Sequence, residues 1–279
     1  MDDALIRFER PAEGVARLVL NRGPARNAQS VDLLYALDDA FHDALRDDNV
    51  RAIILSGDGP DFSAGHDLRK LLTDEPVARF EARGGGAGYG QPGGHAYMAR
   101  EREMFFDLTR RWRNLAKPTI AQVHGNCIAA GLILAWACDL IVAADNAVFS
   151  DPTVAMGVCG VEWFAHPWEL GSRKAKELLF TGSSWTAAEA KSFGMVNQVV
   201  PPEELADFTL SMASRIAAQP VLAVKLAKEA INGAVDLQGQ RAALDMAFSV
   251  HQLCHYHNRE QFGFEGNPAG MPGLMQKKP

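Results

Sequence analysis

The first part of the chain alternates between two hydrophobic periods. Apolar and polar residues alternate along 5–8 and 15–20, on either side of a turn at 11–14, which predicts an antiparallel hairpin. After Ser30, a residue type that often caps helices, apolar side chains recur at helical spacing until an acidic stretch is reached. The apolar run 51–56 then predicts a buried strand. The predicted order is therefore β-β-α-β.

A similar cycle follows. The pattern predicts a helix over 98–115, a strand over 119–123, a helix of mostly small residues over 129–137, and strands at 139–143 and 147–149. Strands that alternate with helices in this way favour an α/β fold with helices packed on a sheet. No GxGxxG motif follows the first strand, which argues against a dinucleotide-binding version of that fold.

The pattern changes near residue 201. Long helical periodicity runs over 203–218 and 221–255, with no convincing strand between them. We therefore predict an α/β core over 1–200 and a helical C-terminal subdomain over 201–279. Within that subdomain, the Gly-, Pro- and Lys-rich tail 263–279 is expected to extend over the surface or to fray.

Composition and charge exclude several functional classes. The 279 residues are 47% hydrophobic and 22% charged, as in globular proteins, and a net charge of −6 without basic blocks argues against nucleic-acid binding. The four cysteines form no CxxC pair, which is typical of free thiols in a reducing compartment. No apolar stretch reaches the roughly 18 residues of a membrane span. A cytoplasmic protein without a membrane partner is expected.

A glycine-rich stretch, 84–94, includes a GxGxxG match at 88–93. It lacks the GK[ST] ending of a phosphate loop and does not lead from a buried strand into a helix. A mobile lid over an active site, spanning 82–97, is the better interpretation.

A histidine and cysteine cluster lies in the last predicted helix, at His251, Cys254, His255 and His257. The i,i+4 histidine pair could bind a metal if two more ligands faced it. No carboxylate stands in register along this segment, so solvated histidines are expected and no metal site is predicted. A GxSxG motif is absent, which argues against a serine hydrolase of the α/β type.

Two strand-to-helix turns carry the more specific chemistry. The segment 62–68, FSAGHDL, follows a buried strand, and its Ala-Gly centre lets the backbone approach a ligand closely. The segment 125–134 follows another strand, with small residues at 129–131. Two main-chain N–H groups aimed at one point form an oxyanion hole, in which each donor contributes about 2.7–4 kcal/mol to transition-state stabilisation. Small residues at such turns also serve simply as packing devices.

Six motifs stand in an order that resembles the crotonase (enoyl-CoA hydratase/isomerase) superfamily, over roughly residues 5–255. They are NRGPARNA at 21–28, FSAGHDL at 62–68, KPTIAQVHG at 117–125, AAG at 129–131, CDLI at 138–141 and FTG at 180–182. The resemblance implies a repeated β-β-α spiral core, a helical C-terminal trimerisation region, and trimers or dimers of trimers. It also implies an acyl-CoA thioester as the substrate, with coenzyme A as part of that substrate and no separate cofactor.

The resemblance assigns roles to individual positions. The oxyanion-hole amides of the family fall on His66 and Ala130. Its coenzyme A-contacting segments fall on five positions: Arg26, Ala28, Ala64, Asp67 and Leu68. Chemistry next to a thioester carbonyl builds negative charge on oxygen, which two fixed N–H dipoles stabilise.

The acid and base residues depart from the hydratase pattern. The two glutamates of enoyl-CoA hydratases match Ile133 and Thr153 in this chain, and neither side chain can act as a general base near neutral pH. Hydration by the two-carboxylate route is therefore not expected, although the chain still groups with enoyl-CoA hydratases and isomerases.

Two carboxylates could replace the missing pair. Glu162 lies near the position where dienoyl-CoA isomerases and some dehalogenases of the superfamily carry an acid, and an apolar neighbourhood is expected to raise its pKa. Asp151 is the second candidate, with a turn residue before Pro152 as the alternative interpretation. His66 resembles the histidine of methylmalonyl-CoA decarboxylase-like members, where the N–H matters and the imidazole can meet the substrate, but its ring could equally serve packing or a supporting hydrogen bond.

Two functions from different classes therefore remain. The first is an enzyme that stabilises an acyl-CoA enolate, with isomerisation, decarboxylation and thioester hydrolysis all open. The second is a catalytically silent acyl-CoA-binding protein, which the absence of both glutamates favours and Glu162 argues against. An α/β protein unrelated to coenzyme A would require the motif order to be coincidence.

Overall fold

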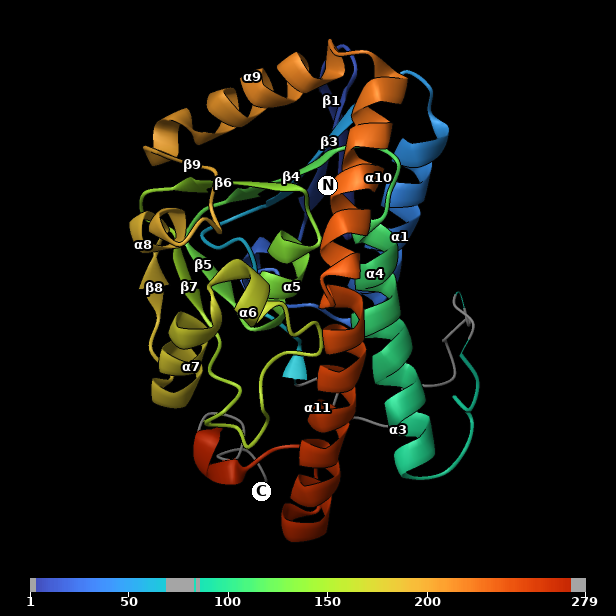
Figure 1. Cartoon of the computed structure of the whole chain (residues 1–279), viewed down its shortest axis with the longest axis vertical. Coiled ribbons are helices and arrows are strands. Elements are labelled where there is room, and N and C mark those ends of the chain that lie inside the picture. The colour runs from blue at the N-terminus through green and yellow to red at the C-terminus, as the bar shows by residue number, and fades with distance from the viewer. Residues whose placement is uncertain (1–3, 69–82, 84–85, 272–279) are drawn as a thin grey trace.

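A six-stranded sheet forms the centre of the computed structural model, which describes residues 4–68, 83 and 86–271 (Figure 1). The strands lie in the order β1 (Ile6–Ala12), β2 (Val15–Leu20), β3 (Ala52–Gly57), β4 (Thr119–Val123), β6 (Leu140–Ala144) and β9 (Gln198–Val200). The β1–β2 hairpin is antiparallel, whereas every later neighbour pairs in parallel. The hairpin and the alternation predicted from the sequence are confirmed.

A smaller sheet packs beside the first. It consists of β5 (Asn126–Ile128), β7 (Val148–Ser150) and β8 (Trp185–Thr186), with β5 and β7 parallel and β7 and β8 antiparallel. An isolated bridge from Ser63 to Cys127 joins the segment after β3 to the edge of β5. The FSAGHDL segment is therefore held against the segment that leads to the Ala-Ala-Gly turn.

Helices surround the two sheets. Their bounds are α1 (Val31–Arg46), α3 (Gly94–Glu101), α4 (Leu108–Arg113), α5 (Ala130–Trp136), α6 (His166–Glu169), α7 (Ser172–Thr181), α8 (Ala187–Ser192), α9 (Leu205–Ala217), α10 (Val221–Leu237) and α11 (Gln240–Phe262). The hydroxyl of Ser30 accepts a hydrogen bond from the main-chain N–H of Leu33, as expected for a helix cap. A π-helical segment, Arg102–Asp107, joins α3 to α4.

The large sheet is buried on both faces. One face packs with α1, α4 and α5 in the larger hydrophobic cluster. The other face is covered by α9, which lies across β4, β6 and β9 in Figure 1 and contributes Leu205, Ala213 and Ala217 to a second cluster. Burial on both sides explains why β3 is almost continuously apolar instead of alternating. The mixed α/β class with C-terminal helices is confirmed.

The C-terminal helices differ from the sequence prediction in one respect. The periodicity over 221–255 predicts one long helix, but the chain turns at Gly239, which has a left-handed φ of 103° and separates α10 from α11. Glycine adopts this conformation without the steric penalty that other residues incur, so it permits the break between two helices that continue in the same direction along α4 towards α3 (Figure 1). The second helix then continues beyond His255 to Phe262. Figure 1 shows α11 running alongside α3 and α4.

Parts of two predicted features lie outside the described residues. In the glycine-rich stretch, 86–93 form a loop and α3 begins at Gly94, while 84–85 are not described, so the lid remains a prediction. In the tail, the N–H of Asn267 donates to the carbonyl of Met156 at 2.7 Å, which fastens that part to the core. Residues 272–279 lie outside the described part. Among the described helices, none is long and apolar enough to cross a bilayer.

Candidate active site

The FSAGHDL segment is held on both of its edges by main-chain hydrogen bonds. On one side, Gln29 donates to the carbonyl of Gly65 at 2.8 Å and accepts from Asp67 at 2.9 Å. On the other side, Ser63 donates to the carbonyl of Asn126 at 3.1 Å and accepts from Ile128 at 3.0 Å. The segment is therefore fixed between the loop before α1 and strand β5.

The two strand-to-helix turns touch at positions where only glycine fits. Gly65 has a φ of +88°, and a Cβ there would lie 2.8 Å from the carbonyl oxygen of Ile128 and 3.2 Å from the nitrogen of Ala130. A Cβ on Gly131 would lie 2.6 Å from the carbonyl oxygen of Ser63. The main-chain nitrogen of Ala130 therefore packs against Gly65, the residue directly before His66.

Both of these N–H groups are free to bind an acceptor. Ala130 is the first residue of α5, where a main-chain N–H has no partner within the helix. Ala129 precedes it with a φ of 49°, a strained value for a residue other than glycine, and such strain is frequent at functional sites. Among the described residues, neither the His66 N–H nor the Ala130 N–H donates a hydrogen bond. The two turns that carry these N–H groups are in contact, and neither group is paired within the described part of the chain.

We predict that Gly65→Ala destabilises the protein by about 1–3 kcal/mol more than Gly194→Ala. Both glycines have nearly the same φ, +88° and +87°, but a Cβ at Gly194 meets nothing within 4 Å. Gly194→Ala therefore tests the left-handed penalty alone, whereas Gly65→Ala adds a backbone clash. Urea unfolding of the two variants measures the difference. Equal destabilisation would contradict the close contact.

The five positions assigned to coenzyme A lie close together. The N–H of Ala64 donates to the carbonyl of Arg26 at 2.9 Å, and Arg22 links the two segments by donating to the carbonyl of Ala28 and to the carboxylate of Asp67, the latter at 2.9 Å. Leu68 follows directly. The Nε of Arg26 lies 3.6 Å from a carboxylate oxygen of Asp61, but the Arg26 side chain is 65% exposed and so remains accessible to an anionic ligand. The structure brings these residues to one edge of the candidate site.

Glu162 is buried beside His66. Its Oε2 lies 3.2 Å from Nε2 of His66, and its Oε1 lies 3.6 Å from Nε2 of His251. Burial acts to raise the pKa of this carboxyl, but the charges of His66 and His251, together with the hydrogen bond from His66, lower it to about 2. The expected rise in the pKa of Glu162 is therefore wrong, because the neighbourhood contains two imidazoles and is not apolar. Glu162 is a carboxylate at neutral pH.

The imidazole of His66 is fixed between Glu162 and an aromatic ring. It packs against Phe105 with ring centroids 3.8 Å apart, and its Nδ1 is buried without a hydrogen-bond partner among the described residues. The ring is therefore held in place, while Nδ1 keeps its hydrogen-bonding capacity.

Asp151 has a different environment. One carboxylate oxygen accepts from the N–H of Thr153 at 3.1 Å and from its hydroxyl at 2.6 Å, and the other accepts from Val161 at 3.2 Å and contacts Nε2 of His166 at 2.8 Å. Burial acts to raise the pKa of Asp151, but the hydrogen bond and charge of His166 outweigh burial and lower it. Asp151 therefore fixes the loop that leads to Glu162. Ile133, at the other matched hydratase position, is buried in the hydrophobic core.

We predict that Asp151→Asn reduces the dependence of the unfolding free energy on pH in the acidic range. The pKa of Asp151 is lower in the folded protein than its ordinary value of 3.8, so its contribution to stability is present above that value and is lost as the pH falls below it. At pH 7, breaking a buried pair of this kind should cost about 3–5 kcal/mol, because His166 is left unpaired. Unfolding free energies measured from pH 7 to pH 2.5 test this. Asp207→Asn, at an exposed site, should leave the profile unchanged.

The histidines of the last helix are not solvated, contrary to the sequence interpretation. His251 and His255 are 3% and 9% exposed, and they face the carboxylates of Glu101 and Glu162. The expectation failed because the carboxylates come from other segments of the chain. Glu101 was not identified from the sequence, since it stands in the highly charged run RERE and nothing local indicates that it is buried.

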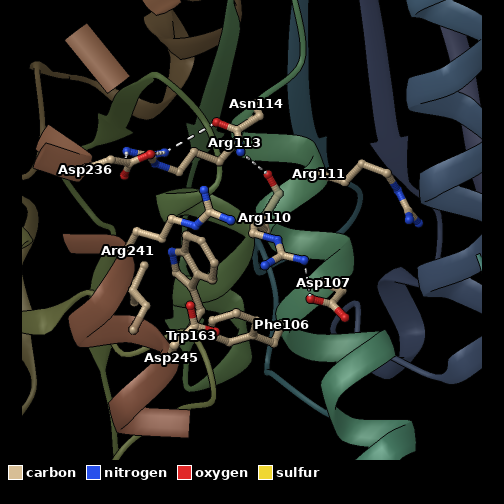
Figure 2. Close-up of a pocket in the computed structure, with 11 residues that line it drawn as sticks. Phe106, Asp107, Arg110, Arg111, Arg113, Asn114, Trp163, Asp236, Arg241 and Asp245 are labelled. Atoms are coloured by element: carbon tan, nitrogen blue, oxygen red, sulfur yellow. Dashed lines mark hydrogen bonds and ion pairs between the residues drawn. The ribbon is translucent and has the colours of Figure 1, made fainter. Parts of the chain in front are cut away.

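A separate cavity of about 380 Å³ lies between α4, α11 and the loop that carries Trp163 (Figure 2). Its lining includes four arginines, but Arg113 pairs with Asp236 at 3.1 Å and Arg110 pairs with Asp107 at 2.9 Å. Neither His66, Ala130 nor Glu162 lines it. This cavity is thus distinct from the two touching turns.

The geometry at the two turns, on an α/β core with C-terminal helices, defines a protein of the crotonase class. A family model described as enoyl-CoA hydratase/isomerase matches residues 10–267. The chain belongs to the enoyl-CoA hydratase/isomerase family and is an acyl-CoA enzyme of that family.

Individual relatives carry names for more than one reaction. EchA13 of Mycobacterium tuberculosis, named as an enoyl-CoA hydratase, is 47% identical, with 92% of this chain and 83% of the relative covered. The crystal structure of a probable enoyl-CoA hydratase from Mycobacterium smegmatis superposes with a TM-score of 0.84 at 42% identity, covering 94% of this chain and 99% of that chain. A monofunctional enoyl-CoA isomerase from Mycobacterium smegmatis superposes with a TM-score of 0.66 at 27% identity, covering 85% and 98%. Similarity alone therefore leaves the reaction open.

Proposed function

We propose that this protein binds an acyl-CoA thioester and stabilises the enolate formed at its α-carbon, without a separate cofactor. The observation that carries the proposal is the contact between the two turns, which carry the N–H groups of His66 and Ala130, both without a hydrogen-bond partner among the described residues. A thioester oxygen that accepts both hydrogen bonds gains most from them when it carries the negative charge of an enolate.

Glu162 is the proposed proton carrier. Its carboxylate adjoins the side chain of His66, the residue whose N–H forms half of the proposed oxyanion hole. A carboxylate in this position can accept a proton from the α-carbon of the substrate, directly or through the imidazole of His66, and return it to another carbon. Asp151 is the weaker candidate, because four contacts already occupy its oxygens.

The reaction we favour is proton transfer within the acyl group rather than hydration. Ile133 and Thr153 occupy the positions matched to the hydratase glutamates, and the Thr153 hydroxyl donates to Asp151. Neither side chain can activate water near neutral pH. Isomerisation needs one proton carrier and an oxyanion hole, the roles proposed for Glu162 and for the N–H groups of His66 and Ala130. Decarboxylation and thioester hydrolysis, which use the same enolate or oxyanion stabilisation, are the secondary alternatives.

Coenzyme A is expected to bind along the edge formed by Arg26, Ala28, Ala64, Asp67 and Leu68. The exposed guanidinium of Arg26 suits a phosphate group of coenzyme A. A catalytically silent acyl-CoA-binding protein is the second candidate, favoured by the loss of both hydratase carboxylates.

We predict that the protein exchanges the α-hydrogens of a bound acyl-CoA with deuterium from solvent. Glu162→Gln should abolish exchange while acyl-CoA binding persists, because the amide cannot accept the proton. Ala130→Pro should slow exchange by about 10²–10³-fold, since it removes one N–H donor at a helix position where proline is tolerated. Exchange is followed by mass spectrometry over a panel of acyl-CoAs.

Controls separate loss of chemistry from loss of folding. Ser172→Pro places proline at the first residue of α7, away from both turns, and should leave exchange unchanged. Melting temperatures with and without acyl-CoA verify that each variant folds and binds. Binding without exchange in the unmodified protein, over the whole panel, would establish the silent alternative instead.

We also propose that the chain forms a homotrimer, or a dimer of trimers, through its C-terminal helices. Large apolar side chains are exposed along one side of α11, at Met246, Val250 and Leu253, and along α10, at Leu222 and Leu226. Exposed large apolar side chains on neighbouring helices are typical of protein–protein interfaces.

Replacement of Leu253, which is 66% exposed, provides the test. Leu253→Asp should shift the sedimenting species to the monomer, because a carboxylate cannot be buried unpaired in an apolar interface. Leu253→Met, which keeps the surface apolar, should preserve the assembly. Identical sedimentation of the Asp and Met variants would place the interface elsewhere.

A further inference from the structure

Four buried side chains from three separate segments converge behind Glu162. They are Glu101 at the end of α3, Glu162 in the loop after β7, and His251 and His255 one helical turn apart on α11. One nitrogen or oxygen atom of each lies within 4.8 Å of the corresponding atoms of the other three. All four residues are at least nine-tenths buried.

Main-chain hydrogen bonds fix both imidazoles in one orientation. Nδ1 of His251 lies 2.8 Å from the carbonyl oxygen of Gly160, and Nδ1 of His255 lies 2.7 Å from that of Glu265. A carbonyl oxygen only accepts, so each Nδ1 carries a hydrogen, and in the neutral ring each Nε2 then offers a lone pair. Histidines that bind metals are typically oriented in this way, with the second ring nitrogen donating to a carbonyl or carboxylate.

Both Nε2 atoms point at the carboxylates without reaching hydrogen-bond distance. Nε2 of His251 lies 3.6 Å from Oε1 of Glu162 and 3.9 Å from Oε2 of Glu101, and Nε2 of His255 lies 3.6 Å from Oε2 of Glu101. The buried Nε2 of His251 has no hydrogen-bond partner among the described residues.

Three of the separations between these atoms are close to those of a coordination shell, and all lie within 4.8 Å. Ligands about 2.1 Å from a tetrahedral zinc ion lie about 3.4 Å from one another, somewhat closer than the three measured separations. Histidines at i and i+4 of a helix form one side of such sites in metalloproteins. A divalent cation would also neutralise the two buried carboxylates, which otherwise require protonated partners.

We propose that Glu101, Glu162, His251 and His255 form a binding site for a divalent transition-metal cation, of which Zn²⁺ is the best match. Two imidazole nitrogens and two carboxylate oxygens suit Zn²⁺, whereas Mg²⁺ and Ca²⁺ prefer oxygen ligands throughout. Gln252 donates to Oε2 of Glu101 and helps to orient that carboxylate. The cation would fasten α11 to the end of α3 and to the Glu162 loop.

The cation site shares Glu162 with the proposed proton-transfer site, but its test does not require acyl-CoA. The cation would take Oε1 of Glu162 and leave Oε2, which contacts His66. Metal binding is measured without acyl-CoA, and the exchange of acyl-CoA α-hydrogens is measured in chelator-treated protein. Failure of one proposal can therefore be distinguished from failure of the other.

Calorimetric titration of chelator-treated, full-length protein with Zn²⁺ tests the proposal. We expect one Zn²⁺ per chain, a higher melting temperature on loading, and no saturable binding of Mg²⁺ under the same conditions. His255→Ala and Glu101→Gln should each weaken Zn²⁺ binding at least tenfold, because each removes a ligand. His257→Ala, at an exposed histidine of the same helix, is the matched control and should bind as the unmodified protein does.

Two results would overturn the site. The first is a failure of the metal-binding test: either the unmodified protein shows no saturable Zn²⁺ binding, or both His255→Ala and Glu101→Gln keep the same Zn²⁺ affinity. Circular dichroism verifies that the variants are folded. The second involves the neighbouring thiols of Cys159 and Cys254, which contact each other. Binding that survives His255→Ala but disappears in the Cys159→Ser, Cys254→Ser double variant would assign the metal to those thiols instead.

Discussion

The arrangement of the candidate site depends on one backbone contact, between Gly65 and the turn that opens α5. Any side chain at Gly65 would overlap the carbonyl of Ile128, and any at Gly131 would overlap the carbonyl of Ser63. The two glycines let peptide groups from different strands approach as closely as atoms in a well-packed core. The turn that carries the Ala130 N–H therefore packs directly against Gly65, the residue before His66, and the strained Ala129 lies at the same contact. Because the contact is between backbone groups, this constraint does not depend on the neighbouring side chains.

A second level of organisation consists of buried polar groups that hold the loop after β7. Asp151 is bonded to Thr153, Val161 and His166, and Glu162 follows directly in the same loop. Burying a charge without partners is costly, so such a loop is stable only when each carboxylate finds donors. Here the partners come from α6 and α11 as well as from the loop itself. The C-terminal helix α11 thereby contacts Glu162, the proposed proton carrier, through His251.

Local sequence determined much of what could be predicted. The strands, the first helix and the two turns follow from periodicity, capping and the position of glycine, which are all properties of neighbouring residues. The break at Gly239 was missed because a single glycine inside a helical pattern is often tolerated. The burial of Glu101, His251 and His255 depends on how α11 packs along α3, and this long-range contact leaves no trace in the local pattern. The pKa of Glu162 was misjudged for the same reason, since His251 stands far from it in the chain.

The π-helical segment Arg102–Asp107 sets the rotational phase between α3 and α4. Each residue of an α-helix turns the chain by about 100°, and wider π turns accommodate additional residues without lengthening the helix in proportion. An uninterrupted α-helix over the same stretch would rotate Glu101 relative to Phe105, Phe106 and Trp112, which are anchored in the core. Because of the wide turn, Phe105 and Phe106 can face the core while the carboxylate of Glu101 faces α11.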